Sequence, residues 1–185
     1  MKKLNEKDIK QKSKFLSLIL RHSPERIQLK LDNNGWADVE ELLAKSKRKV
    51  NLDLKTLEIV VETNNKKRFS FNEDKTKIRA NQGHSLKNID LELKAVEPPQ
   101  FLYHGTVDKF MQSIREKGLQ KMNRQHVHLS NDRETAVNVG SRRGKPVILS
   151  VRTLEMYTNG FEFFLSENGV WLTDNVPSKY IEFKD

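Results

Sequence analysis

The distribution of apolar residues changes at a Pro-Pro pair near the middle of the chain, in Glu97-Pro98-Pro99-Gln100. Before this pair the apolar residues recur mostly at helical spacing, whereas after it they form short runs bordered by polar residues. A Pro-Pro pair favours extended backbone and interrupts a helix. The 185 residues suffice for two small lobes around a cleft. We therefore predict an α+β protein with lobes at residues 1–97 and 98–185.

Three helices are predicted in the first lobe. Apolar residues near helical spacing predict a helix over 8–21, which Pro24 ends. Asp38 begins a capping-box-like start for a second helix that runs to about Lys47. The third helix is expected over 54–62.

A hairpin follows these helices. Residues 67–71 alternate polar and apolar side chains as a strand does, 72–75 form a turn, and 76–80 return as a second strand. Three helices followed by a hairpin is the pattern of a winged helix, a fold in which the hairpin and a helix usually contact nucleic acid. We therefore predict a winged-helix-like first lobe.

The second lobe is predicted to be rich in strands. Short helices are expected over 107–117 and 133–139, the latter capped by Asn131 or Asp132. The expected strands are short apolar runs at 101–103, 126–129, 147–151, 161–165, 170–172 and 180–183.

The charge of the chain is positive and uneven. Net charge is +9, and residues 1–98 hold 22 Lys and Arg against 15 Asp and Glu, whereas residues 99–185 hold 12 against 10. A basic excess favours a polyanionic partner, because neutralising phosphates releases counterions. A lysine-rich, solvated surface is the alternative explanation of the same charge.

Composition excludes several classes of site. The chain contains no Cys, which excludes disulfides, thiolate catalysis and Cys-ligated zinc. Its N-terminus lacks an apolar signal core, and its apolar runs are shorter than the roughly 20 residues that span a bilayer. We expect a cytoplasmic protein without a membrane partner.

Basic and polar residues gather at three places in the first lobe. Arg21-His22 stands where the first helix ends, and Arg68 lies in the predicted first strand. Arg79 precedes the loop Asn81-Gln82-Gly83-His84-Ser85, which can offer hydrogen bonds to phosphates or base edges. Each place also has a plain structural explanation, such as cations complementing a helix dipole. Together they indicate a phosphate-binding function.

The second lobe places His, Gly, Ser and Thr beside its short strands. Tyr103-His104-Gly105-Thr106 follows a predicted strand, so that Gly105 would let a ligand approach the backbone. His128-Leu129-Ser130 and Arg142 lie downstream. The spacing of the two His residues predicts no local metal site. No P-loop or Gly-rich dinucleotide fingerprint is present, so any dinucleotide would bind in a non-Rossmann way.

In this order, the motifs resemble those of the RNA 2′-phosphotransferase family, the NAD-dependent enzymes associated with tRNA splicing. The resemblance runs from Arg21-His22 to the end of the segment 174–181 and covers nearly the whole chain. It rests on the blocks Leu16–His22, Ile78–Ser85, Leu102–Thr106, His126–Ser130, Gly144–Val147 and Gly169–Thr173.

The resemblance implies an RNA-binding winged-helix-like lobe followed by a lobe like those of ADP-ribosyltransferases. It places the family's catalytic set on Arg21, His22, Arg68 and Arg142, with Arg143 standing beside Arg142, in a cleft between the lobes. It implies an NAD site that is identified by His104, His128 and Val170. Gly105, Thr106 and Ser130 would also contribute to NAD binding. Arg79, Asn81, Gln82 and His84 would contact RNA or NAD.

The implied reaction removes an internal 2′-phosphate from RNA, as at a tRNA splice junction, and consumes NAD without a metal. The products would be 2′-OH RNA, nicotinamide and ADP-ribose 1″,2″-cyclic phosphate, formed by way of RNA-2′-phospho-ADP-ribose. We expect a monomer.

Two alternatives stay open at this point. One is a winged-helix nucleic-acid-binding protein whose second lobe is structural. The other is a transferase that leaves ADP-ribose on a protein or a nucleic-acid end. Protein-modifying enzymes of that kind often use a Glu near the last strand; Gly169-Val170-Trp171 lacks one, although Glu162 and Glu167 are nearby.

Overall fold

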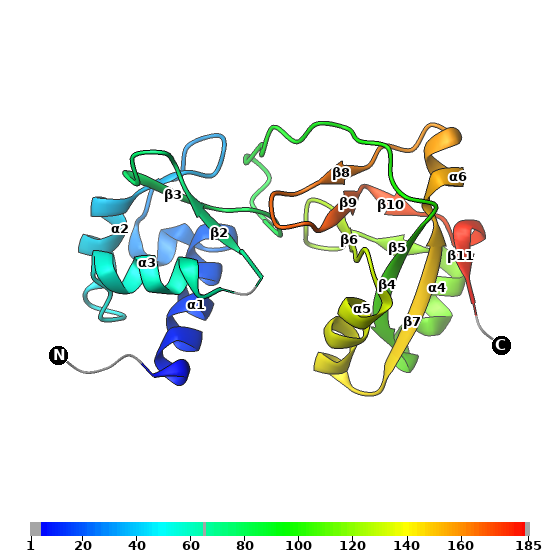
Figure 1. Ribbon diagram of the computed structural model, residues 1–185, viewed down its shortest axis with the longest axis horizontal. Helices are drawn as coiled ribbons and strands as arrows, with labels where there is room; N and C mark the ends of the chain where they lie inside the picture. The colour runs from blue at the N-terminus through cyan, green and yellow to red at the C-terminus, as the bar shows by residue number, and fades with distance from the viewer. Residues whose placement is uncertain (1–4, 65, 184–185) are drawn as a thin grey trace. The chain divides into compact units, whose positions relative to one another are not determined.

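The computed structural model describes residues 5–64 and 66–183, which contain six α-helices and several small antiparallel sheets (Figure 1). The mixed α+β class predicted from the sequence is confirmed. Contacts between Cα atoms divide the chain into two compact units, Met1–Glu92 and Leu93–Asp185.

The first unit contains three α-helices, and a side chain caps the start of each. The amides of Asp8, Glu41 and Thr56 donate to the side chains of Asn5, Asp38 and Asp53, which satisfies backbone groups that have no partner inside the helix. The elements are α1 (Glu6–Arg21), the 3-10 helix η1 (Pro24–Ile27), β1 (Ala37–Asp38), α2 (Val39–Ser46), α3 (Leu54–Glu62), β2 (Phe69–Phe71) and β3 (Lys77–Ala80).

A three-stranded antiparallel sheet accompanies these helices, in the order β1-β3-β2. Phe69 pairs with Ala80 and Phe71 with Ile78, so the predicted hairpin is confirmed. The short strand β1 adds Ala37 opposite Ile78 and was not predicted. Helices and sheet share one apolar core, because the helices bury their apolar stripes against it. Its fully buried members include Leu16, Leu20, Leu42, Leu57, Val60 and Ile78.

The second unit is built mainly from short antiparallel strands with small helices between them (Figure 1). Its strands are β4 (Phe101–Val107), β5 (Leu119–Gln120), β6 (Val127–Leu129), β7 (Pro146–Arg152), β8 (Phe164–Leu165), β9 (Trp171–Thr173), β10 (Asn175–Val176) and β11 (Ile181–Glu182). Its helices are η2 (Asp108–Phe110), α4 (Met111–Lys117), α5 (Arg133–Gly140), η3 (Ser141–Arg143), α6 (Thr153–Thr158) and η4 (Ser178–Tyr180).

Two three-stranded sheets dominate this unit, in the orders β11-β7-β4 and β6-β9-β8, and a two-stranded ribbon joins β10 to β5. An isolated bridge between Tyr103 and Ser130 links β4 to the end of β6. The core lies between these sheets and includes Leu102, Leu149, Val151, Phe163 and Tyr180.

Several predicted boundaries in this unit were wrong. β4 continues through Val107 rather than ending at Tyr103, because Gly105 and Thr106 pair with Ile148 and Val147. The strand predicted over 180–183 is shorter, because residue 180 ends a 3-10 helix and only the two residues of β11 are extended. The strand predicted over 161–165 is also shorter, because β8 begins only at Phe164. Helix α6 was not predicted.

No helix within residues 5–64 and 66–183 combines the length and apolar character that crossing a membrane requires.

Candidate active site

The end of α1 places Arg21 and His22 beside the loop 81–85. Arg21 is the last residue of α1, and His22 caps it with its amide donating to the Leu18 carbonyl at 3.1 Å. The His22 Nδ1 atom lies 3.0 Å from Ser85 Oγ, and the Ser85 amide donates to the Arg21 carbonyl at 3.0 Å. The loop is therefore attached to both residues of the predicted Arg-His pair.

The other end of the same loop is attached beside Arg68. The Asn81 amide donates to the Arg68 carbonyl at 2.9 Å, and its side-chain amide donates to the Lys67 carbonyl at 2.7 Å. Arg68 lies one residue before β2, outside the strand in which it was predicted, and donates from Nη1 to Asn64 Oδ1 at 3.1 Å. The loop thus bridges Arg21, His22 and Arg68, which are far apart in the sequence.

Two guanidinium groups of this site lie over aromatic rings. Arg79 lies 4.5 Å from the centre of the Trp36 ring, and Arg21 lies 5.9 Å from that of Phe69. An aromatic face attracts a guanidinium cation and restricts its motion, while the N–H groups at the edge of the guanidinium can still donate hydrogen bonds.

Asn81 and His84 are buried, whereas the sequence predicted a loop that offers its side chains to a ligand. His84 is 0% exposed, and both ring nitrogens lack a hydrogen-bond partner among the described residues. Burial, together with the nearby charges of Arg21, His22 and Arg79, lowers the pKa of His84 to about 4. His84 is therefore neutral at physiological pH.

In the second unit, the bridge between β4 and β6 brings the predicted His residues together. The amide of Tyr103 donates to the Ser130 carbonyl at 2.9 Å, and the Ser130 amide donates back at 2.7 Å. His104 Nδ1 lies 3.1 Å from the His128 carbonyl, which makes it the donor of that hydrogen bond. Burial lowers the pKa of His104, and Arg124 and Arg143 act in the same direction, while the bond to His128 opposes them.

Gly105 has a structural role that the sequence did not reveal. A Cβ atom on Gly105 would lie 1.9 Å from the Ala136 carbonyl oxygen and 2.9 Å from the Gly140 nitrogen. Gly105 therefore allows α5 to approach β4, as Figure 1 also shows. This contact is a second reason for glycine at this position, beside the predicted approach of a ligand to its backbone. Thr106 is buried in the same strand.

Val170 lies directly before β9, and Arg142 lies within η3. Val170 precedes Trp171, which pairs with Leu129, so it lies at the same end of the sheet as Ser130. Arg142 is exposed in η3. The neighbouring Arg143 lies over the ring of Phe110, 5.8 Å from its centre.

The sequence matches known proteins along nearly all of its length. The model of the RNA 2′-phosphotransferase, Tpt1 / KptA family matches residues 7–175. A probable RNA 2′-phosphotransferase of Flavobacterium johnsoniae is 65% identical over 98% of this chain and 100% of its own length. Those of Fusobacterium nucleatum and Burkholderia pseudomallei are 59% and 55% identical, each over 92% of this chain and 96% and 93% of their own lengths.

The chain belongs to the RNA 2′-phosphotransferase family. This family transfers a 2′-phosphate from RNA and uses NAD as its co-substrate.

Arg124 is a basic residue of the second unit that the sequence analysis did not assign. Its Nη1 atom lies 3.5 Å from His128 Nδ1. Burial lowers the pKa of Arg124, and the charges of Arg143 and Arg142 contribute to the same shift. An anion stabilises positive charges that interact in this way, and a dinucleotide supplies one in its diphosphate. The signal in the sequence was its place directly before the block that contains His126 and His128.

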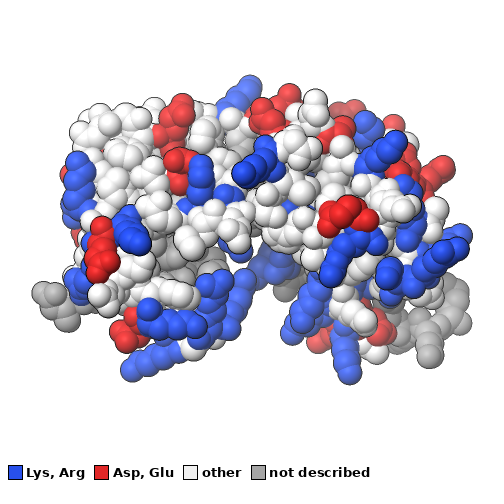
Figure 2. All heavy atoms as spheres, turned by 180° about the vertical axis from the view of Figure 1, so that it is seen from behind, with Lys and Arg blue, Asp and Glu red and all other residues white. Residues whose placement is uncertain are grey.

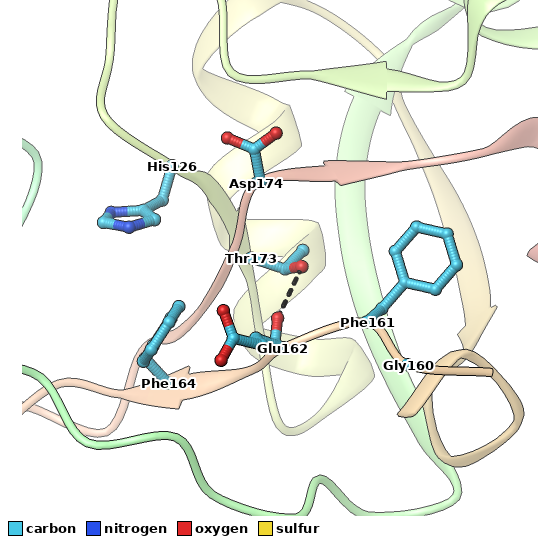
Figure 3. Close-up of a pocket in the computed structure, with 7 residues that line it drawn as sticks. All are labelled: His126, Gly160, Phe161, Glu162, Phe164, Thr173 and Asp174. Atoms are coloured by element: carbon cyan, nitrogen blue, oxygen red, sulfur yellow. Dashed lines mark hydrogen bonds between the residues drawn. The ribbon is translucent and has the colours of Figure 1, made fainter. Parts of the chain in front are cut away.

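A separate open pocket in the second unit contains none of the predicted site residues (Figure 3). Thr173 Oγ1 donates to the Glu162 carbonyl at 2.9 Å there, and the rings of His126 and Phe164 lie 5.7 Å apart. The pocket is lined by His126, Gly160, Phe161, Glu162, Phe164, Thr173 and Asp174. Glu162, one of the two Glu residues considered for a catalytic role, therefore lines this pocket.

Within the described residues, no group of three or more His, Asp and Glu side chains is placed to hold a metal ion.

Proposed function

We propose that this chain removes an internal 2′-phosphate from RNA in two chemical steps, with NAD as acceptor. The observation that carries the proposal is the loop 81–85, which joins Arg21, His22 and Arg68 in a protein whose family transfers 2′-phosphates. Three cationic or hydrogen-bonding groups around one loop suit a dianionic phosphate.

We assign RNA binding to the first unit, as a winged-helix-like lobe. Its element order is helix, strand, helix, helix, strand, strand, and its sheet order is β1-β3-β2, which support that assignment. Exposed Lys47, Arg48 and Lys49 follow α2 and can neutralise RNA phosphates. On the face in view in Figure 2, Lys and Arg side chains are more prominent than Asp and Glu.

We assign NAD binding to the second unit, as a lobe like those of ADP-ribosyltransferases. His104, His128 and Ser130 are brought together by the bridge between β4 and β6, and Val170 lies at the same end of the sheet as Ser130. Arg124 adds a positive charge beside His128 that suits the diphosphate. Thr106 and Gly105 support this site through the strand they share with His104.

The phosphate is assigned to Arg21, Arg68 and Arg142, with His22 as a hydrogen-bonding group. The spacing of the family's motif favours Arg142 over the adjacent Arg143 for this role. Arg79 and Gln82 are assigned to RNA or NAD contacts. Asn81 and His84, being buried, act by holding the loop.

In the first step, an oxygen of the RNA 2′-phosphate attacks the anomeric carbon of the nicotinamide ribose. The glycosidic bond breaks and nicotinamide leaves with the bonding electrons, which gives RNA-2′-phospho-ADP-ribose. The nucleophile is already anionic and the leaving group is cationic in NAD. The residues therefore accelerate this step mainly by holding the reactants in position.

In the second step, the 2″-hydroxyl of that ribose loses its proton and attacks the phosphorus. The RNA 2′-oxygen leaves and takes up a proton, giving 2′-OH RNA and ADP-ribose 1″,2″-cyclic phosphate. Charge grows on the phosphoryl oxygens, where the Arg side chains stabilise it electrostatically. We assign protonation of the departing 2′-oxygen to His22.

The test is a short RNA with one internal, radiolabelled 2′-phosphate, incubated with and without NAD and without added metal. Transfer of the label to ADP-ribose cyclic phosphate only with NAD supports the proposal. Label that stays on the RNA overturns it and favours a nucleic-acid-binding protein. An ADP-ribosylated product that persists as the end product favours the alternative transferase. We further propose that the enzyme acts as a monomer, which light scattering measures.

A further inference from the structure

The imidazole of His22 is held by the side chain of Ser85, which lies 63 residues away in the sequence. The distance between His22 Nδ1 and Ser85 Oγ is 3.0 Å, within the range of a hydrogen bond. His22 is exposed and Ser85 is half-buried, so the less accessible Ser85 side chain orients the more accessible imidazole ring of His22.

Ser85 is itself fixed by its neighbours. Its amide donates to the Arg21 carbonyl at 3.0 Å, and His84, directly before it, is fully buried. At the other end of the loop, Asn81 is bonded to the carbonyls of Lys67 and Arg68. The backbone that carries the Ser85 hydroxyl is therefore anchored on both sides, by hydrogen bonds that do not use the Ser85 side chain.

We propose that Ser85 is a positioning residue that fixes the orientation and tautomer of His22 for the phosphate-transfer chemistry. This inference rests on the proposed function, in which His22 protonates the departing RNA 2′-oxygen. The Ser85 hydroxyl oxygen accepts a hydrogen bond from His22 Nδ1–H, which keeps the proton on Nδ1 in the neutral ring. Nε2 is then the nitrogen that carries the transferred proton.

The chemistry of the two steps predicts where Ser85 matters. Departure of nicotinamide needs no proton from the enzyme, whereas the 2′-oxygen leaves more easily when it is protonated. A His22 ring that turns or changes tautomer still contributes to phosphate binding but places Nε2–H less often on the leaving oxygen. Loss of the Ser85 hydroxyl therefore slows the second step more than the first.

The experiment measures both steps in single turnovers of the full-length enzyme with 2′-phosphorylated RNA and NAD. We expect Ser85→Ala to slow the second step roughly 10- to 100-fold, the size of effect that a small misplacement of a reacting group produces. RNA-2′-phospho-ADP-ribose should accumulate while the first step stays within about 3-fold of wild type. Ser85→Thr keeps a hydroxyl at the same carbon and should restore most of the second-step rate.

A double-mutant cycle separates positioning from a general loss of structure. If Ser85 acts through His22, then Ser85→Ala causes no further slowing in a His22→Ala background. Thermal unfolding of each variant checks the fold, and Ser113→Ala on the exposed face of α4 is the matched control. An unimpaired second step in Ser85→Ala, or a full effect that persists without His22, overturns the inference.

Failure of this inference is distinguishable from failure of the proposed function. If the wild-type enzyme transfers the phosphate and Ser85→Ala has the same second-step rate, only the proposed role of Ser85 is rejected. A folded wild-type protein that forms neither the intermediate nor the cyclic phosphate rejects the proposed function, and the inference with it.

Discussion

Tyr103 and Ser130 exchange two main-chain hydrogen bonds, of 2.9 and 2.7 Å, and so join β4 to the end of β6. Because both bonds use backbone groups, the link between the strands does not depend on the Ser130 hydroxyl. The same link brings His104 to the carbonyl of His128. The backbone link at this end of β6 is therefore independent of the side chain at position 130.

This bridge predicts that Ser130→Ala weakens NAD binding without unfolding the protein. The lost hydroxyl removes about one hydrogen bond to the ligand, so KM for NAD should rise roughly 10-fold. The melting temperature should stay within about 2 °C of wild type. Steady-state kinetics and thermal unfolding measure the two effects, and an unchanged KM would contradict the assignment of Ser130 to the NAD site.

Gly105→Ala should destabilise the protein strongly, because the new Cβ would meet the Ala136 carbonyl at 1.9 Å. Separating β4 from α5 should cost roughly 3 kcal/mol or more. Gly160→Ala is the matched control: its φ is +88°, but no atom lies within 4 Å of the added carbon, so about 1 kcal/mol is expected. Urea unfolding measures both, and equal losses would reject the steric explanation.

Stability should fall as the pH is lowered through the range in which His84 titrates. The pKa of His84 is lowered from 6.5 to about 4 in the folded protein, so below pH 6.5 the unfolded chain binds a proton that the folded protein excludes. This difference removes about 3 kcal/mol of the free energy of unfolding by pH 4.

The comparison with His84→Leu isolates this effect. His104 and His126 also have lowered pKa values and contribute the same sign in both proteins. The free energy of unfolding should therefore decline less steeply with falling pH in the variant. Parallel pH dependences in urea unfolding would show that His84 is not buried as a neutral group.

Arg142→Ala should trap the ADP-ribosylated RNA intermediate, because the second step requires stabilisation of charge on the phosphoryl group. A second-step rate lowered roughly 100-fold is expected, with the first step less affected. Arg143→Ala is the control on the adjacent residue, whose guanidinium lies over Phe110. If Arg143→Ala traps the intermediate and Arg142→Ala does not, the two assignments must be exchanged. Arg68→Ala should behave as Arg142→Ala does.

The sequence by itself determined the three α-helices and the hairpin of the first unit, because their signals act over a few residues. Asp38 accepts from the Glu41 amide, as the capping pattern predicted, and α3 has the predicted bounds Leu54–Glu62. The order of motifs also identified the family, since their spacing is a property of the chain alone. Short strands such as β1 and β10 were missed, because pairing with a distant partner forms them rather than local periodicity.

Only the tertiary structure decided which residues meet. The sequence placed His84 among ligand-facing groups, whereas packing removes it from solvent and makes Ser85 the residue that reaches His22. Likewise, the close approach of α5 to Gly105 depends on residues more than 30 positions away in the sequence. Burial and backbone contact depend on residues distant in the sequence, and a local pattern carries no information about them.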